Sequence, residues 1–135
     1  MTSFFDTNVL IYIYDIGHPD KHHKARELFA EEASADHVMI STQVLQEFYA
    51  AVTSKKIMGE EVAEQAVIRF MQLPVRQIDI PVIQSAMRRK RIDQVSFWEA
   101  LIIETALSGG ADVLWSEDFQ HGRIFDGLEV RDPFQ

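Results

Sequence analysis

The chain has 135 residues, of which 47% are hydrophobic, with a mean hydropathy of −0.10 and a net charge of −8. This length suits one domain with its own core, so residues 1–135 are expected to form a single domain. The absence of cysteine excludes disulfides and thiolate metal sites. The N-terminus lacks the basic and apolar segments of a signal peptide, and no apolar run reaches the ~20 residues that span a bilayer. We therefore expect a cytoplasmic protein with no membrane partner.

The negative charge disfavours nucleic acid as a ligand, because phosphates are usually held by a basic face. Two features weaken this argument. Residues 88–91 form a cationic run, Arg-Arg-Lys-Arg, which suits either RNA phosphates or the C-terminal end of a helix dipole. Carboxylates that hold divalent metals also count as negative charge, although bound metal neutralises them. Nucleic acid binding is therefore not excluded by the composition.

In the first half of the chain, short apolar runs typical of buried strands alternate with helical patterns. The predicted elements are a strand over 2–6, a helix over 7–14, a helix over 20–35, a strand over 37–41, and a helix that begins with Thr42 as its cap and ends near residue 55.

The second half repeats this alternation. Its predicted elements are a helix between Gly59 and Pro74, a strand over 75–80, a helix from Pro81 to the basic run, a helix over 96–107, and strands over 112–116 and 128–131. Strands that alternate with helices predict an α/β fold, in which a mostly parallel sheet is covered on both sides. Ligands of such sheets bind at the carboxyl ends of the strands.

Two acids directly follow predicted strands. Asp6 stands after the first strand and opens a helix, and Asp118 comes just after the fourth strand. A helix cap would explain Asp6, and a turn would explain Asp118. Their positions at strand ends favour a functional interpretation, because ligands of parallel sheets gather there.

Two glutamates lie on predicted helices. Glu47 falls at the edge of an apolar stripe, where a half-exposed surface residue is the more common case. Glu99 lies in the apolar stripe that includes Ile102 and Ile103, near the start of its helix. The segment Ser96-Phe97-Trp98-Glu99 also matches a capping box, in which the glutamate reaches back to the cap residue. The sequence leaves both roles of Glu99 open.

These four acids have no Lys or Arg next to them in the sequence. Gathered at one sheet edge, they would repel each other, and such repulsion is tolerated mainly where Mg²⁺ or Mn²⁺ compensates it. Metal sites built only from oxygen ligands favour phosphoryl chemistry. The set therefore predicts a metal site suited to phosphoryl chemistry.

Four segments, in this order and spacing, are similar to the motifs of a known family. They are Phe5-Asp6-Thr7-Asn8-Val9-Leu10, the segment from Ser41 to Tyr49, the segment from Ser96 to Ile103, and Leu114-Trp115-Ser116-Glu117-Asp118-Phe119. On these motifs the chain resembles PIN-domain proteins, most closely the VapC-type toxins of bacterial toxin–antitoxin pairs. The resemblance covers essentially the whole chain.

The resemblance implies a PIN-like three-layer α/β/α fold with strand order 3-2-1-4-5. It implies Mg²⁺ or Mn²⁺ as cofactor and endonucleolytic cleavage of single-stranded RNA. It also implies a homodimer and an antitoxin protein that occupies the active-site groove. By motif match, the catalytic acids and metal ligands are Asp6, Glu47, Glu99 and Asp118, with Thr7 and Ser116 as supporting hydroxyls.

One position departs from the family pattern, because Glu99 stands where the family usually has Asp. The extra methylene moves the carboxylate outward, and Mg²⁺ demands near-octahedral geometry, whereas Mn²⁺ is more forgiving. An alternative function is therefore a PIN-like module that binds RNA or protein with weakened or no catalysis. A haloacid-dehalogenase-like phosphatase is a weaker alternative, because it needs a second acid where Asn8 stands. Glu117 is left outside the predicted set.

Other residues that could bind ligands are assigned structural roles. Trp98 and Trp115 could stack on bases, but both lie in apolar elements, and packing in the core is expected for them. His18, His22 and His23 are expected at a solvated helix start.

Overall fold

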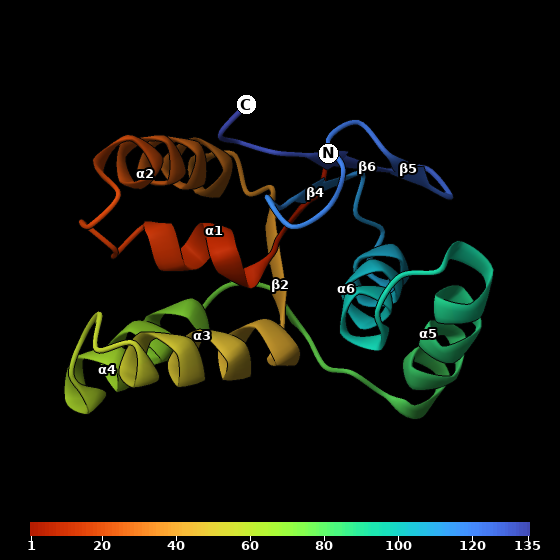
Figure 1. The fold of residues 1–135 in the computed structure, drawn as a ribbon, viewed down its shortest axis with the longest axis horizontal. Coiled ribbons are helices and arrows are strands. Elements are labelled where there is room, and N and C mark those ends of the chain that lie inside the picture. The colour runs from red at the N-terminus through yellow and green to blue at the C-terminus, as the bar shows by residue number, and fades with distance from the viewer.

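Strands and helices alternate along the chain in the computed structural model, which describes residues 1–135 (Figure 1). The elements are β1 (Ser3–Phe5), α1 (Thr7–Tyr12), α2 (Pro19–Ser34), β2 (Val38–Ser41), α3 (Thr42–Ser54), α4 (Glu60–Phe70), β3 (Val75–Arg76), α5 (Ile80–Asp93), α6 (Phe97–Ser108), β4 (Val113–Trp115), β5 (Ile124–Phe125) and β6 (Leu128–Arg131).

A single sheet with the strand order β3-β2-β1-β4-β6-β5 runs through the molecule. All neighbouring strands are parallel except β5 and β6. Phe4 of β1 pairs with Met39 on one side and Leu114 on the other, so β1 is a central strand. The predicted order of five strands is confirmed, with β6 as the fifth. The short β5 is an addition, joined to β6 by Asp126-Gly127, whose φ angles of 50° and 92° make a tight hairpin turn.

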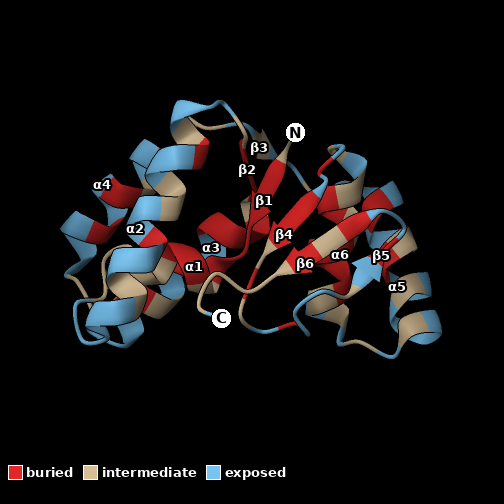
Figure 2. Ribbon diagram, turned by 90° about the horizontal axis from the view of Figure 1, so that it is seen from above, coloured by how far each residue is buried: buried red, intermediate tan, exposed pale blue.

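Helices cover both faces of the sheet, as a three-layer fold requires (Figure 2). Helices α1 to α4 lie on one side and α5 and α6 on the other. Phe4 and Phe5 of β1 are fully buried between these layers, together with Ile40 and Leu114 of the neighbouring strands. None of the helices combines the length and apolar character that a membrane-spanning segment needs.

Among the predicted element boundaries that differ from the structure, two are explained by helix-capping residues. Ser41, not Thr42, caps α3, because its backbone is still extended at the end of β2 and its Oγ accepts a hydrogen bond from the Val44 amide at 3.3 Å. The predicted strand over 75–80 is reduced to Val75–Arg76. Asp79 ends it by capping α5, where its Oδ1 accepts from the Val82 amide at 3.0 Å.

Candidate active site

Asp6 lies where the central strand β1 ends and α1 begins. Its backbone is extended, and its Oδ1 accepts a hydrogen bond from the Thr7 amide at 2.8 Å, so Asp6 is the N-cap of α1. The hydroxyl of Ser116 donates to Oδ2 at 2.7 Å. The side chain is nearly inaccessible, with 6% exposure. The capping role expected for Asp6 is therefore present, and it places a buried carboxylate at the carboxyl edge of the sheet.

The charge on Asp6 is unfavourable in this setting. Burial raises the pKa of Asp6 from 3.8 to about 6, against the hydrogen bonds from Ser116 and Thr7, which lower it. The negative charges of Asp118 and Glu47 raise the pKa further. No ion pair includes any of these three carboxylates. The three carboxylates therefore create a region of negative potential at this edge of the sheet.

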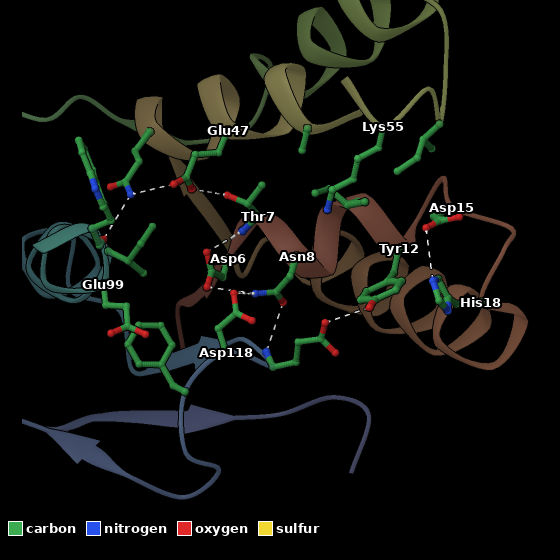
Figure 3. A pocket seen from close by; sticks show the side chains of 18 residues that line it. Asp6, Thr7, Asn8, Tyr12, Asp15, His18, Glu47, Lys55, Glu99 and Asp118 are labelled. Atoms are coloured by element: carbon green, nitrogen blue, oxygen red, sulfur yellow. Dashed lines mark hydrogen bonds and ion pairs between the residues drawn. The ribbon is translucent and has the colours of Figure 1, made fainter. Parts of the chain in front are cut away.

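Asn8 connects Asp6 with Asp118 (Figure 3). Its Nδ2 lies 3.2 Å from Asp6 Oδ2, 3.0 Å from Asp118 Oδ2 and 3.2 Å from Ser116 Oγ. The amide group thus brings partial positive charge between two carboxylates. Asn8 is a site residue outside the predicted set, and its position two residues after Asp6, in the first turn of α1, is the sequence signal for this role.

Glu47 faces the same site from α3. The Thr7 hydroxyl donates to Glu47 Oε1 at 2.7 Å, and Gln43 Nε2 donates to Oε2 at 3.3 Å. Gln43 and Glu47 are one helical turn apart, so they share a face of α3. Each predicted hydroxyl therefore contacts a predicted acid: Thr7 contacts Glu47, and Ser116 contacts Asp6.

Glu99 stands apart from the other three acids. Its Oε1 accepts from the Ser96 amide at 2.9 Å, and the Glu99 amide donates to Ser96 Oγ at 3.1 Å, which completes a capping box. No hydrogen bond joins Glu99 to Asp6 or Asp118. The structural role that the sequence left open for Glu99 is therefore present.

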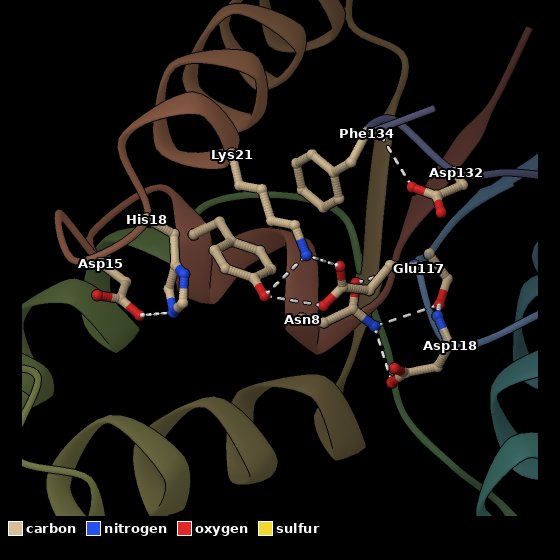
Figure 4. A network of polar contacts seen from close by, with 10 residues as sticks. Asn8, Asp15, His18, Lys21, Glu117, Asp118, Asp132 and Phe134 are labelled. Atoms are coloured by element: carbon tan, nitrogen blue, oxygen red, sulfur yellow. Dashed lines mark hydrogen bonds and ion pairs between the residues drawn. The ribbon is translucent and has the colours of Figure 1, made fainter.

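Glu117 is turned away from the acids and takes part in a separate network (Figure 4). Its carboxylate accepts from Lys21 Nζ at 2.8 Å and from the Tyr12 hydroxyl at 2.9 Å. Its backbone amide donates to Asn8 Oδ1 at 3.2 Å. Glu117 therefore helps to orient the Asn8 amide and leaves its own carboxylate paired with a lysine.

A groove of about 760 Å³ passes over the acids. The groove is lined by all four predicted acids: Asp6, Glu47, Glu99 and Asp118. No three acids or histidines lie close enough together to form a complete metal-binding cluster. The donor chemistry nevertheless suits Mg²⁺ or Mn²⁺, which prefer carboxylate and water oxygens. A buried carboxylate of raised pKa beside two other acids is a position where a divalent cation would be stabilised.

Two expectations about side chains outside the acid set are resolved by the structure. Trp98 is 63% exposed and lines the groove, so its assignment to the core was wrong. Arg89, the second residue of the basic run, forms ion pairs with three acids: Asp93, Glu104 and Asp126. Arg89 therefore belongs to the packing of α5 and is not free to bind phosphate.

Several solved structures are similar to this chain in fold. The toxin VapC20 of Mycobacterium tuberculosis, which cleaves the sarcin–ricin loop, has a TM-score of 0.70 and 23% identity over 84% of this chain and 87% of its own. A toxin–antitoxin complex from Klebsiella pneumoniae has a TM-score of 0.72 and 18% identity, covering 98% of both chains. A DNA-bound VapBC from Salmonella typhimurium has a TM-score of 0.71 and 21% identity, with the same coverage.

These likenesses establish the shared fold. The search of curated proteins found no match. The family model of the PIN domain matches residues 3–125, which is most of the chain and includes all four acids. The chain therefore belongs to the PIN domain family.

Proposed function

We propose that this protein is a metal-dependent endoribonuclease that cleaves single-stranded RNA. The observation that carries the proposal is the buried Asp6 carboxylate, which has a raised pKa, two acidic neighbours and no cationic partner. Such a carboxylate is costly for a fold to keep unless a bound cation compensates its charge. The groove above it gives access to an extended substrate.

In this proposal, Asp6, Glu47 and Asp118 hold the metal from three elements of the fold, and Glu99 contributes from the start of α6. Bound Mg²⁺ or Mn²⁺ supplies charge neutralisation at the phosphate and a water of lowered pKa. The chain itself orients the ligands, because Ser116 holds Asp6 Oδ2 and the Thr7 hydroxyl holds Glu47 Oε1. Such supporting hydrogen bonds fix the direction of the carboxylate lone pairs.

We further propose that the chain is the toxin of a toxin–antitoxin pair, acting in the cytoplasm as a homodimer. The solved toxin–antitoxin complex and the DNA-bound VapBC support this partner through their shared fold. An antitoxin segment seated in the groove would cover the acids and block RNA. Co-expression with the protein encoded beside this chain, followed by purification, tests the pairing.

A second candidate function is RNA binding without cleavage. It is favoured by one observation, the hydrogen bond between Glu99 Oε1 and the Ser96 amide, which engages the fourth acid in a helix cap. A weakened ligand set could hold a metal and RNA without assembling the geometry that cleavage needs. The two functions differ in whether the intact protein cuts the RNA that it binds.

The test is cleavage of an end-labelled single-stranded RNA with Mg²⁺, with Mn²⁺ and with EDTA. We expect cleavage only with metal, and a loss of at least about 100-fold in Asp6→Asn with an unchanged far-UV circular dichroism spectrum. Glu64→Gln, an exposed acid on α4, is the matched control and should cleave normally. Wild-type cleavage by Asp6→Asn would refute the nuclease proposal. Metal-dependent binding without cleavage by the wild type would support the second function.

A further inference from the structure

Trp98 is turned outward by the local structure of α6. Ser96 caps the helix, so Phe97 and Trp98 occupy its first two positions, which point about 100° apart around the axis. Phe97 packs inward against the small core between α5 and α6. The Trp98 indole therefore projects away from this core and remains 63% exposed. An indole is rarely left so open, because it offers much apolar surface to bury.

The exposed ring stands at the rim of the groove that holds the acids. The backbone that carries this ring is tied to α3, because Gln43 Nε2 donates both to the Trp98 carbonyl oxygen and to Glu47 Oε2, each at 3.3 Å. One amide group thus ties the start of α6 to a predicted metal ligand on α3. The Phe97 ring also contacts the indole edge-on, with ring centroids 5.3 Å apart. The start of α6 is therefore anchored beside the acids, and the indole packs on Phe97 at that place.

We propose that the Trp98 indole is a stacking platform for one nucleobase of single-stranded RNA, next to the phosphodiester that is cleaved. This inference rests on the proposed nuclease function. A chain of net charge −8 with an acidic groove gains little from general attraction to phosphates. Stacking on an aromatic ring holds the substrate through the uncharged face of a base, and any base supplies such a face. It also favours single strands, whose bases are free to leave the stack.

The first experiment combines a protein variant with a substrate variant. Single-stranded RNAs that carry one abasic nucleotide, placed in turn at each position around the cleavage site, are cut by the wild type and by Trp98→Ala. We expect one abasic position to slow the wild type by about 5- to 150-fold, and Trp98→Ala to slow the intact RNA by a similar factor. The two losses should not add, because both remove the same stacked pair. Trp98→Phe should recover part of the activity.

The controls separate stacking from other roles of Trp98. Ile68→Ala removes exposed apolar surface from α4, outside the groove, and should leave cleavage unchanged. If Trp98→Ala lowers cleavage but responds to every abasic position as the wild type does, its role is structural and the inference fails. A changed sedimentation coefficient of Trp98→Ala without the abasic-specific loss would assign Trp98 to a protein interface and would also overturn the inference. Unchanged cleavage by Trp98→Ala overturns it directly.

The second experiment does not depend on cleavage. In the single variant Trp115→Phe, which keeps every predicted metal ligand, Trp98 is the only tryptophan, and a base stacked on it quenches its fluorescence. We expect quenching by a single-stranded oligoribonucleotide in Mg²⁺, recorded by stopped flow before cleavage, and none by the same RNA in a duplex. If the wild type cuts no RNA but this quenching occurs, the proposed function fails and the stacking site stands. If the wild type cuts RNA without quenching, the stacking inference alone fails.

Discussion

Asp6→Asn should make the metal-free protein more stable, which tests the acid cluster without any substrate. Burial raises the pKa of Asp6 from 3.8 to about 6, so the folded state binds this proton more tightly than the unfolded state. The free energy of unfolding therefore falls as the pH rises from about 3.8 to about 6, and the loss is complete above that range. The difference between the two pKa values corresponds to roughly 3 kcal/mol.

The variant should recover only part of this energy. The oxygen of Asn can still accept from the Thr7 amide, but its NH2 group replaces Oδ2, which accepts from Ser116 Oγ at 2.7 Å and from Asn8 Nδ2 at 3.2 Å. Leaving a buried donor without its acceptor costs about 1–2 kcal/mol, so the net gain is about 1–2 kcal/mol at pH 7.5. For a chain of this length, such a gain raises the melting temperature by roughly 5 °C.

Calorimetry of the wild type, Asp6→Asn and Glu64→Gln in EDTA gives the result. Asp6→Asn should melt above the wild type at pH 7.5 and lose this advantage near pH 4, and Glu64→Gln should follow the wild type at both values. Mn²⁺ at tenfold its dissociation constant should then stabilise the wild type by ~1.4 kcal/mol and Asp6→Asn much less. If Asp6→Asn is neutral or less stable in EDTA, and Mn²⁺ affects all three proteins alike, the carboxylates do not form a charged cluster and the metal site is refuted.

Three further predictions concern other parts of the molecule. Glu99→Gln keeps a side chain that can cap α6, so the melting temperature of this variant should be unchanged. Its affinity for Mn²⁺, measured by calorimetric titration, should fall. Glu99→Asp should keep or raise the rate of RNA cleavage with Mg²⁺. Lys55→Gln, at the groove, should make the salt dependence of RNA binding shallower, by about 0.7 in the slope of log affinity against log salt. Burial raises the pKa of Glu32, but hydrogen bonds from Ser3 and His37 outweigh it and leave that pKa below its ordinary value. Because stability from a lowered pKa is present at neutral pH and lost in acid, Glu32→Gln should lower the melting temperature at pH 7 by an amount that fades below pH 4.5.

The strands of the sheet could be predicted because they are short, apolar and flanked by polar residues. This pattern located β1, β2, β4 and β6 to within a residue or so. It overextended β3, because the apolar residues Val75 to Ile80 include a turn that Asp79 makes by capping the next helix. It missed β5, whose two residues are too few for any periodicity, although Asp126-Gly127 is a common hairpin turn.

Trp98 shows where apolar composition misleads. Helix α6 is apolar on almost every side, so its pattern does not indicate which face is exposed. Burial of α6 depends on its two neighbours, the sheet and α5, which leave the first turn open beside the groove. Only the positions of those neighbours, which lie far away in the sequence, distinguish an indole in the core from one on the rim.

Glu99 shows that one sequence pattern can serve two roles that compete for the same atoms. A capping box needs a side chain at the third helical position that is long enough to reach back to the cap amide, and Glu99 meets this need. That same length carries Oε1 to the Ser96 amide, away from Asp6 and Asp118. The metal would have to draw this carboxylate from the cap, at a cost set by the hydrogen bond that is lost. We therefore expect the proposed metal site and the capping box to compete for the Glu99 carboxylate, and the outcome of this competition to set the activity of the proposed nuclease.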